Sequence, residues 1–178
     1  DRFANTLTPI LYKGGGNGGD RTYSLWLNSD GSVLVSTSDS TGDQNAQTAA
    51  GLVGLNQWQH VAATINRTNG QLRVYVDGVE RAAGTVRAAA ARTNTNALLI
   101  GRQLESSTTI ANFEGTIDEV RLWNAARSVA DINASKDVAL TGTEAGLAVY
   151  LKANEGLGDR LADSTANHND ALVRPLYP

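Results

Sequence analysis

The segment 72–82 constrains the fold most, because apolar and polar residues alternate on both sides of a two-residue turn. Leu72, Val74 and Val76 fall on one face of an extended strand, and the residues between them fall on the other face. The turn is Asp77-Gly78, a pair that accepts the positive φ angles of tight hairpin turns. The sequence therefore predicts an antiparallel hairpin with one buried face.

A second hairpin is predicted around Asp30-Gly31, where the apolar runs 23–28 and 33–36 flank the turn. Further extended segments follow at 58–65, 98–101 and 146–151. Eighteen glycines, 41% apolar residues and a length of 178 residues suit one β-rich domain with its own core. We therefore expect an all-β fold, a sandwich of two antiparallel sheets. The polar segments 36–50 and 87–96 are interpreted as loops.

The segment 113–124, with the sequence FEGTIDEVRLWN, begins as a strand and then changes the face that carries its apolar residues. Apolar residues occupy odd positions as far as Ile117 and even positions from Val120 onward. This change predicts either a β-bulge near 118–119 or a strand that crosses between two sheets.

One short helix is predicted near 128–136. Ser128 followed three positions later by Asp131 is close to a capping box, which satisfies the free amides at a helix start. The apolar run 146–151 then either closes the sandwich as an edge strand or opens a following repeat. We favour closure, since an open sheet edge needs a partner.

Three segments resemble signatures of bacterial laminin G-like domains of the pentraxin-related kind. They are WQHVAAT at 58–64, VYVDG at 74–78, and the segment 113–124 with the helix start after it, in the order of that family. The resemblance implies a concanavalin A-like jelly roll. It also implies a single domain over 1–178, with a main body at 1–140 that lacks the opening strands and a closing strand and tail at 141–178.

Composition excludes several classes of partner. The net charge is −3 and no basic tract occurs, which argues against nucleic acid. No apolar run is long enough for membrane insertion. Cysteine is absent, and the two histidines lie far apart, so disulfides and a histidine-based zinc site are not expected. The resemblance implies a secreted or cell-surface module, with neighbouring repeats of the same polypeptide as further partners.

Two loops offer oxygen ligands of the kind that Ca²⁺ prefers. Asn17 and Asp20 lie in a glycine-rich loop, and Gln103 and Glu105 follow a predicted strand. The resemblance implies that these positions, with the Leu104 carbonyl, are the calcium ligands. Carboxylates are too few for two metals, so one weak or structural Ca²⁺ is expected, and the alternative is a pair of solvated polar loops.

Asp118 is a separate candidate metal ligand, since a bulge at this point could aim its carboxylate at a cation. The alternatives are that Asp118 caps a turn or pairs with Arg121.

Glycan binding needs an exposed flat apolar face together with planar hydrogen-bonding groups. Trp26 is the candidate aromatic residue, because its side chain is predicted on the strand face opposite to that of Leu25 and Leu27. Asn17 is the second candidate ligand-binding residue. Trp58 and Trp123 are interpreted as core residues.

Catalysis is not expected. Glycosidases of related folds place paired carboxylates at a fixed separation, and the spacing of Glu114, Asp118 and Glu119 does not match that arrangement. The predicted function is a non-catalytic extracellular binding or adhesion module that recognises a glycan or an extracellular glycoprotein. The alternatives are a structural spacer of a large surface protein and an accessory domain of a glycoside hydrolase.

Overall fold

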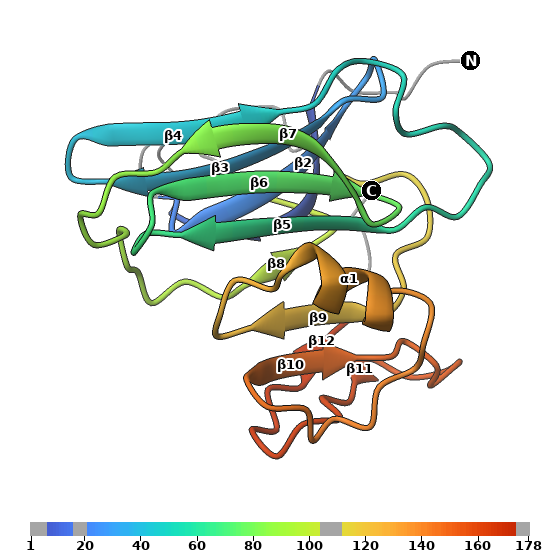
Figure 1. The fold of residues 1–178 in the computed structure, drawn as a ribbon. Coiled ribbons are helices and arrows are strands. Elements are labelled where there is room, and N and C mark those ends of the chain that lie inside the picture. Colours follow the sequence, from blue (N-terminus) through green and yellow to red (C-terminus); the bar gives the residue numbers. More distant parts are fainter. Residues whose placement is uncertain (1–6, 16–20, 104–111, 174–178) are drawn as a thin grey trace. The chain divides into compact units, whose positions relative to one another are not determined.

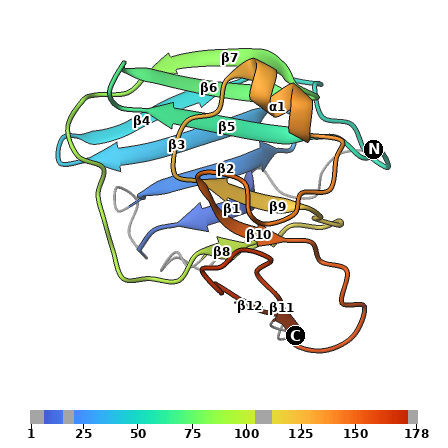
Figure 2. The same cartoon turned by 60° about the horizontal axis from the view of Figure 1, so that its bottom comes forward.

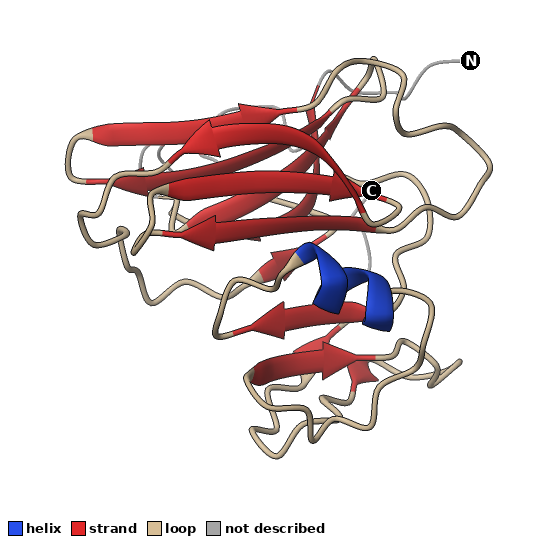
Figure 3. Ribbon diagram, viewed as in Figure 1, coloured by secondary structure: helices blue, strands red, loops and turns tan. Residues whose placement is uncertain are grey.

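The structure is a computed structural model that describes residues 7–15, 21–103 and 112–173. Within these ranges the chain forms twelve strands and one helix (Figure 1, Figure 3). Neighbouring strands pair antiparallel, which confirms the predicted all-β class. The chain divides into two compact units, 1–115 and 116–178.

The first unit contains a five-stranded sheet in the order β4-β3-β2-β1-β8 (Figure 2). Its strands are β1 (Leu7–Lys13), β2 (Tyr23–Asn28), β3 (Val33–Asp39), β4 (Gly42–Gln47) and β8 (Leu99–Ile100). A three-stranded sheet of β5 (Val61–Asn66), β6 (Gln71–Val76) and β7 (Val79–Thr85) lies against it.

The core of this unit lies between the two sheets. Apolar side chains from both sheets share one buried cluster: Leu27, Val33, Val35, Ala46, Leu72, Val74, Val76 and Val86. The face predicted from the alternation at 72–76 is therefore confirmed as the buried one. Burying these side chains removes apolar surface from water, which is the main stabilising term for such a sandwich.

Both predicted hairpin turns are present. Asp77 and Gly78 have φ angles of 52° and 76°, as a two-residue hairpin turn requires. Gly31 has a φ of 76°, and a Cβ atom placed there would lie 2.5 Å from the Val53 carbonyl oxygen. This close approach allows the Val53 amide to donate to the Gly31 carbonyl at 2.9 Å.

A Gly31→Ala variant is expected to be less stable than the matched variant Gly51→Ala. Both glycines have nearly the same positive φ, but a Cβ at Gly51 would meet no atom within 4 Å. The Gly51 variant should therefore lose only the ~1–2 kcal/mol of a strained backbone, and the Gly31 variant should lose a further ~1–3 kcal/mol from overlap. Chemical denaturation measures both, and equal losses would contradict the role of the Val53 contact.

The interpretation of 36–50 as a solvated loop is wrong. β3 continues to Asp39, and β4 pairs with it in register from Leu34–Gln47 to Asp39–Gly42. In β4, Gln44 and Ala46 are buried while their neighbours Asp43, Asn45 and Gln47 are exposed, so this strand does alternate. Its buried positions are mostly small or polar, and the apolar period that marks a strand was therefore hidden.

The second unit contains β9 (Val120–Trp123), α1 (Val129–Ser135), β10 (Leu147–Leu151), β11 (Arg160–Leu161) and β12 (Ala171–Leu172). β9 pairs with β10, and β11 pairs with β12. The predicted helix start is confirmed, because Ser128 and Asp131 form a reciprocal capping box. The single-domain extent of 1–178, with closure by the tail, stays a prediction.

The long strand predicted at 113–124 is wrong in its first half. Only Val120–Trp123 forms a strand, and Glu119, directly before it, has a φ of 55°. A residue in this left-handed conformation turns the chain. The change in the face that carries the apolar residues therefore marks the start of β9 instead of a bulge within a longer strand.

The one helix in the described part of the chain, α1, does not have the length and hydropathy of a membrane span.

Candidate functional site

Most residues of the predicted calcium site lie outside the described residues: Asn17, Asp20, Leu104 and Glu105. Gln103 is buried, and its side-chain oxygen has no hydrogen-bond partner among the described residues. Asp118 is exposed, and its Oδ1 accepts a hydrogen bond from the Glu119 amide at 2.9 Å. Asp118 thus makes the local turn contact that the sequence left open as an alternative to metal binding.

The described neighbours of the two predicted calcium loops lie toward opposite ends of β1. Gly14 and Gly15 follow the last residue of β1, Lys13. β8 runs antiparallel to β1, and the Gly101 amide donates to the Ile10 carbonyl, so Gln103 continues toward the beginning of β1. No group of three or more metal-ligating side chains occurs among the described residues. Calcium binding stays a prediction.

The prediction that Trp26 faces solvent is wrong. Its side chain is 1% exposed, and its ring lies edge-on to the Tyr12 ring at a centroid distance of 5.6 Å. The indole Nε1 donates to Ser24 Oγ at 2.7 Å, which satisfies the one polar atom of the ring. Trp26 therefore offers no open face to a sugar.

The prediction that Trp58 is a core residue is also wrong, because its side chain is 69% exposed. β5 begins at Val61, so Trp58 lies in the turn before the strand and the parity of the strand does not apply to it. Trp123 was also interpreted as core, but it is only half-buried, with the Arg127 guanidinium 4.2 Å from the ring centroid. Trp58 is thus the tryptophan with an open face.

The turn that carries Trp58 is held by the next side chain, Gln59. Gln59 Oε1 accepts from the Gly54 amide at 2.7 Å, and Nε2 donates to the Leu52 carbonyl at 3.0 Å. Nε2 also lies 3.2 Å from Asp77 Oδ2, and the other oxygen of Asp77 accepts from the His60 amide at 2.9 Å. One amide side chain therefore fixes the Trp58 turn to the hairpin turn between β6 and β7.

The surface around this turn combines apolar and amide groups. Leu55 and Val79 are exposed large apolar residues, and Val79 directly follows the Asp77-Gly78 turn to which Gln59 is bonded. Asn56 and Gln57 are exposed in the same turn as Trp58. We call these five residues the Trp58 surface: Leu55, Asn56, Gln57, Trp58 and Val79. The sequence signal that was missed is the polar pair Asn56-Gln57, which indicates a turn directly before Trp58.

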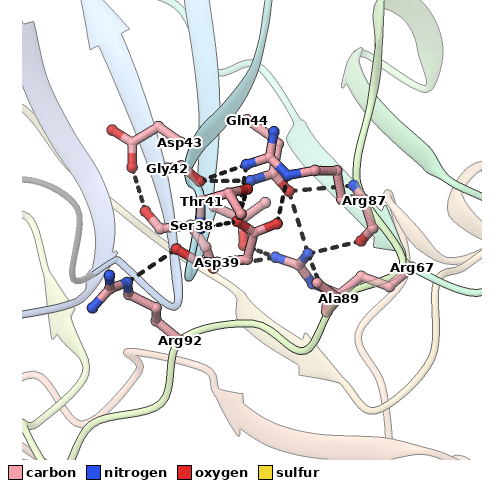
Figure 4. Close-up of polar contacts among 11 residues, drawn as sticks. Ser38, Asp39, Thr41, Gly42, Asp43, Gln44, Arg67, Arg87, Ala89 and Arg92 are labelled. Carbon is pink, nitrogen blue, oxygen red and sulfur yellow. Dashed lines mark hydrogen bonds and ion pairs between the residues drawn. The ribbon is translucent and has the colours of Figure 1, made fainter.

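A buried carboxylate organises the opposite end of this unit (Figure 4). Asp39, at the end of β3, has a side chain that is 0% exposed. Arg87 donates to it through two nitrogens, Nε to Oδ2 at 2.7 Å and Nη2 to Oδ1 at 2.9 Å. Thr41 adds its amide and its hydroxyl. These hydrogen bonds, and above all the pair from Arg87, hold the pKa of Asp39 far below its ordinary value.

Arg67 joins three segments around this carboxylate. Its Nη1 donates to the carbonyls of Arg87 and Ala89 at 3.0 Å each, and its Nη2 donates to Thr37 Oγ1 at 2.8 Å. The cluster thus ties the β3–β4 hairpin to the turn after β5 and to the chain after β7. Its donors and acceptors are largely used internally, so its first role is to stabilise the fold.

A sequence model of laminin G type, from the concanavalin A-like lectin/glucanases superfamily, matches residues 2–133. The chain belongs to this superfamily. The match confirms the predicted family and includes both the Trp58 surface and the Asp39 cluster. No curated protein matches the sequence.

A solved structure similar to this superfamily member is that of a proposed carbohydrate binding protein from Bacteroides ovatus. The two share 22% sequence identity with a TM-score of 0.69, and the similarity covers 96% of this chain and 52% of the other. The chain therefore spans about half the length of that protein, and at this identity the likeness supports the shared fold.

The carboxylates at positions 114, 118 and 119 of this superfamily member differ in their surroundings. Glu119 forms an ion pair with Arg121 and accepts a hydrogen bond from the Tyr150 hydroxyl at 2.7 Å. Glu114 and Asp118 are exposed. The pKa of Tyr150 is raised, chiefly by its burial. Glu119 is thus engaged with a cation and a phenol, which suits a structural role for this carboxylate.

Proposed function

We propose that this domain is a non-catalytic carbohydrate-binding module and that the Trp58 surface is its binding site. The observation that carries the proposal is the exposed ring of Trp58 in a turn fixed by Gln59. Membership of a superfamily named for lectins and glucanases supports it. The described function of the Bacteroides ovatus protein points in the same direction.

The chemistry of the Trp58 surface suits a sugar ring. A pyranose presents C–H groups on one face and hydroxyls around its edge, so a flat indole can cover the face while planar amides bond the edge. Asn56 and Gln57, the two exposed residues before Trp58, carry such amides, and Gln57 Nε2 also donates to Gln59 Oε1 at 3.2 Å. Since Gln59 already holds the turn, little conformational entropy remains to be lost when a glycan binds.

The proposed setting is extracellular, with a glycan or glycoprotein as partner.

Calcium is a proposed ligand of the two predicted loops, whose residues are not those of the Trp58 surface. A ligand that binds only the folded state raises Tm, so Tm should rise with CaCl₂ and fall with EDTA if the site exists. An unchanged Tm would contradict the calcium proposal and leave the sugar proposal standing.

The test of the proposed function uses the fluorescence of tryptophan. The ring of Trp26 is buried and that of Trp123 is half-buried, so acrylamide quenching reports mainly on Trp58. A panel of soluble neutral polysaccharides should contain at least one that protects the protein from quenching in a saturable manner. No reducing ends should be released during the incubation. A panel without any protecting glycan would contradict the proposal, and released reducing ends would contradict its non-catalytic part.

A further inference from the structure

The turn between β5 and β6 contains the pair Asn69-Gly70. It joins the end of β5 to the start of β6, at the left of Figure 1. The pairing of the two strands extends from this turn to the Val61–Val76 pair, next to the Trp58 turn. The two turns are therefore separated by the length of the strands, and the chemistry of Asn69 is separate from the proposed glycan site.

An asparagine that precedes a glycine can lose its side-chain amide in water. The backbone nitrogen of the glycine attacks the asparagine Cγ, the bond between Cγ and the amide nitrogen breaks, and ammonia leaves with the proton of the attacking nitrogen. Glycine favours this step because it has no Cβ to block the approach. Water then opens the succinimide ring at either carbonyl, which gives an aspartate or an isoaspartate.

The structure leaves the attacking nitrogen available. The Gly70 amide donates no hydrogen bond to the described residues, whereas the Gly70 carbonyl accepts from the Val86 amide at 3.0 Å. The residue that would be attacked, Asn69, is exposed, so water and hydroxide reach it. Both reactants of the first step are therefore in place without a rearrangement of the strands.

The side-chain carbonyl of Asn69 is also oriented for this reaction. The Gln71 amide donates to Asn69 Oδ1 at 3.2 Å, which bends the side chain back along the peptide that supplies the Gly70 nitrogen. Oδ1 is the atom that becomes negative when the nitrogen attacks Cγ. A donor already placed on that oxygen stabilises the developing charge.

The turn at Asp30-Gly31 shows the contrast. There the glycine amide donates to the Asn28 carbonyl at 2.9 Å, and Asp30 Oδ1 accepts from the Ser32 amide at 2.8 Å. The nitrogen that would attack is thus already engaged within the turn. The Asn69-Gly70 turn has no such bond from its glycine to the described residues.

We propose that Asn69 is a site of spontaneous covalent modification, at which the folded protein converts asparagine to aspartate and isoaspartate. Water and hydroxide are the only co-reactants. Aspartate adds one negative charge to the turn. Isoaspartate also inserts the side-chain methylene carbon into the backbone directly before Gly70, so it should displace the Gly70 carbonyl from the Val86 amide. The inference does not depend on the proposed function.

Mass spectrometry of tryptic peptides tests the proposal during incubation at mildly alkaline pH. Trypsin cuts after Arg67 and Arg73, and the peptide TNGQLR between these sites contains Asn69 as its one asparagine. Its mass should rise by the difference between an amide and a carboxylic acid. The conversion should be faster at higher pH, because hydroxide removes the proton of the attacking nitrogen.

Asn154 is the matched internal control, since it is also exposed but precedes Glu155. Its tryptic peptide is ANEGLGDR, which again contains one asparagine. Asn69 should convert about tenfold faster or more, which corresponds to a barrier lower by ~1.4 kcal/mol.

Variants separate the charge from the change of backbone. Asn69→Gln keeps an amide but would have to form a larger ring, so its mass and Tm should stay constant during incubation. Freshly prepared Asn69→Asp carries the charge alone, and its Tm should lie within about 1 °C of fresh wild type because the residue is exposed. Fully converted wild type should melt about 2–4 °C lower, since one backbone hydrogen bond is lost.

The synthetic peptide TNGQLR distinguishes the effect of the sequence from that of the fold. Conversion of this peptide with an intact Asn69 in the folded protein would overturn the proposal, because the fold would then hold the Gly70 nitrogen away from Cγ. Equal rates at Asn69 and Asn154 would overturn it as well. An unchanged Tm after conversion to isoaspartate would contradict the displacement of the Gly70 carbonyl. The glycan panel involves other residues, so its failure is distinguishable from each of these results.

Discussion

The Asp39→Ala variant is expected to melt about 5–10 °C below the wild-type protein, because it removes the acceptor at the centre of the Asp39 cluster. Asp39 accepts two hydrogen bonds from Arg87 and two from Thr41, and its side chain is fully buried. Without it, Arg87 loses its bidentate partner and lies beside the positive charge of Arg67. Burial, above all, lowers the pKa of Arg67; the negative charge of Asp39 acts against this shift, and the positive charge of Arg87 adds to it. The Asp39→Ala variant therefore loses the attraction between Asp39 and the two arginines and keeps the repulsion between Arg67 and Arg87.

Asp43→Ala is the matched control on the same hairpin. Asp43 also pairs with an arginine, Arg21, at 3.0 Å, but its side chain is 32% exposed. Ion pairs near solvent contribute little, so this variant should melt within about 2 °C of the wild type. Differential scanning calorimetry compares the two. Equal shifts would contradict the argument that burial makes Asp39 the central residue.

The same carboxylate predicts a pH dependence. The pKa of Asp39 is lowered in the folded protein, chiefly by the Arg87 hydrogen bonds, so the folded state binds the proton less tightly than the unfolded state does. Its contribution is complete above the ordinary aspartate pKa of ~4 and is lost as the pH falls below that range. The difference in Tm between wild type and Asp39→Asn should therefore shrink from pH 7 to pH 3. A constant difference would contradict this assignment.

Glu144 responds to acid in the same direction, in the other unit. The amide of Thr141, above all, lowers the pKa of Glu144 to about 2. Wild type and Asp39→Asn both contain Glu144, so its titration cancels in the difference between them. The comparison thus isolates Asp39 even though both proteins lose stability in acid.

Local sequence patterns predicted the parts of the fold that local chemistry determines. Asp77-Gly78 and Gly31 lie in hairpin turns because these positions require positive φ, and Ser128 starts the helix because its side chain satisfies a free amide. Each of these features depends on residues within a few positions of one another. A single sequence contains all the information they need.

Features that depend on distant partners could not be predicted in this way. Asp39 is buried because Arg87, 48 positions later, neutralises it, and no local pattern indicates this pair. Parity placed Trp26 on the face away from Leu25 and Leu27, but parity does not show whether that face is covered.

The Trp58→Ala variant is expected to lose binding of the protecting neutral glycan by about 30-fold or more, as removal of a central aromatic contact typically does. The ring is largely exposed, so its removal takes little packing from the core and Tm should change by no more than about 2 °C. Trp58→Phe keeps a flat aromatic face and should retain most of the affinity. Isothermal titration calorimetry measures all three proteins.

The control for a general effect of apolar surface is Leu157→Ala. Leu157 is 92% exposed and lies in the second unit, so its loss should leave the affinity unchanged. A second variant, Gln59→Ala, removes the side chain that holds the turn and keeps the indole. It should weaken binding less than Trp58→Ala does, because the loop then loses entropy on binding. If Trp58→Ala binds as well as the wild type, the sugar site lies elsewhere; if Gln59→Ala binds as well as the wild type, preorganisation of the turn does not contribute.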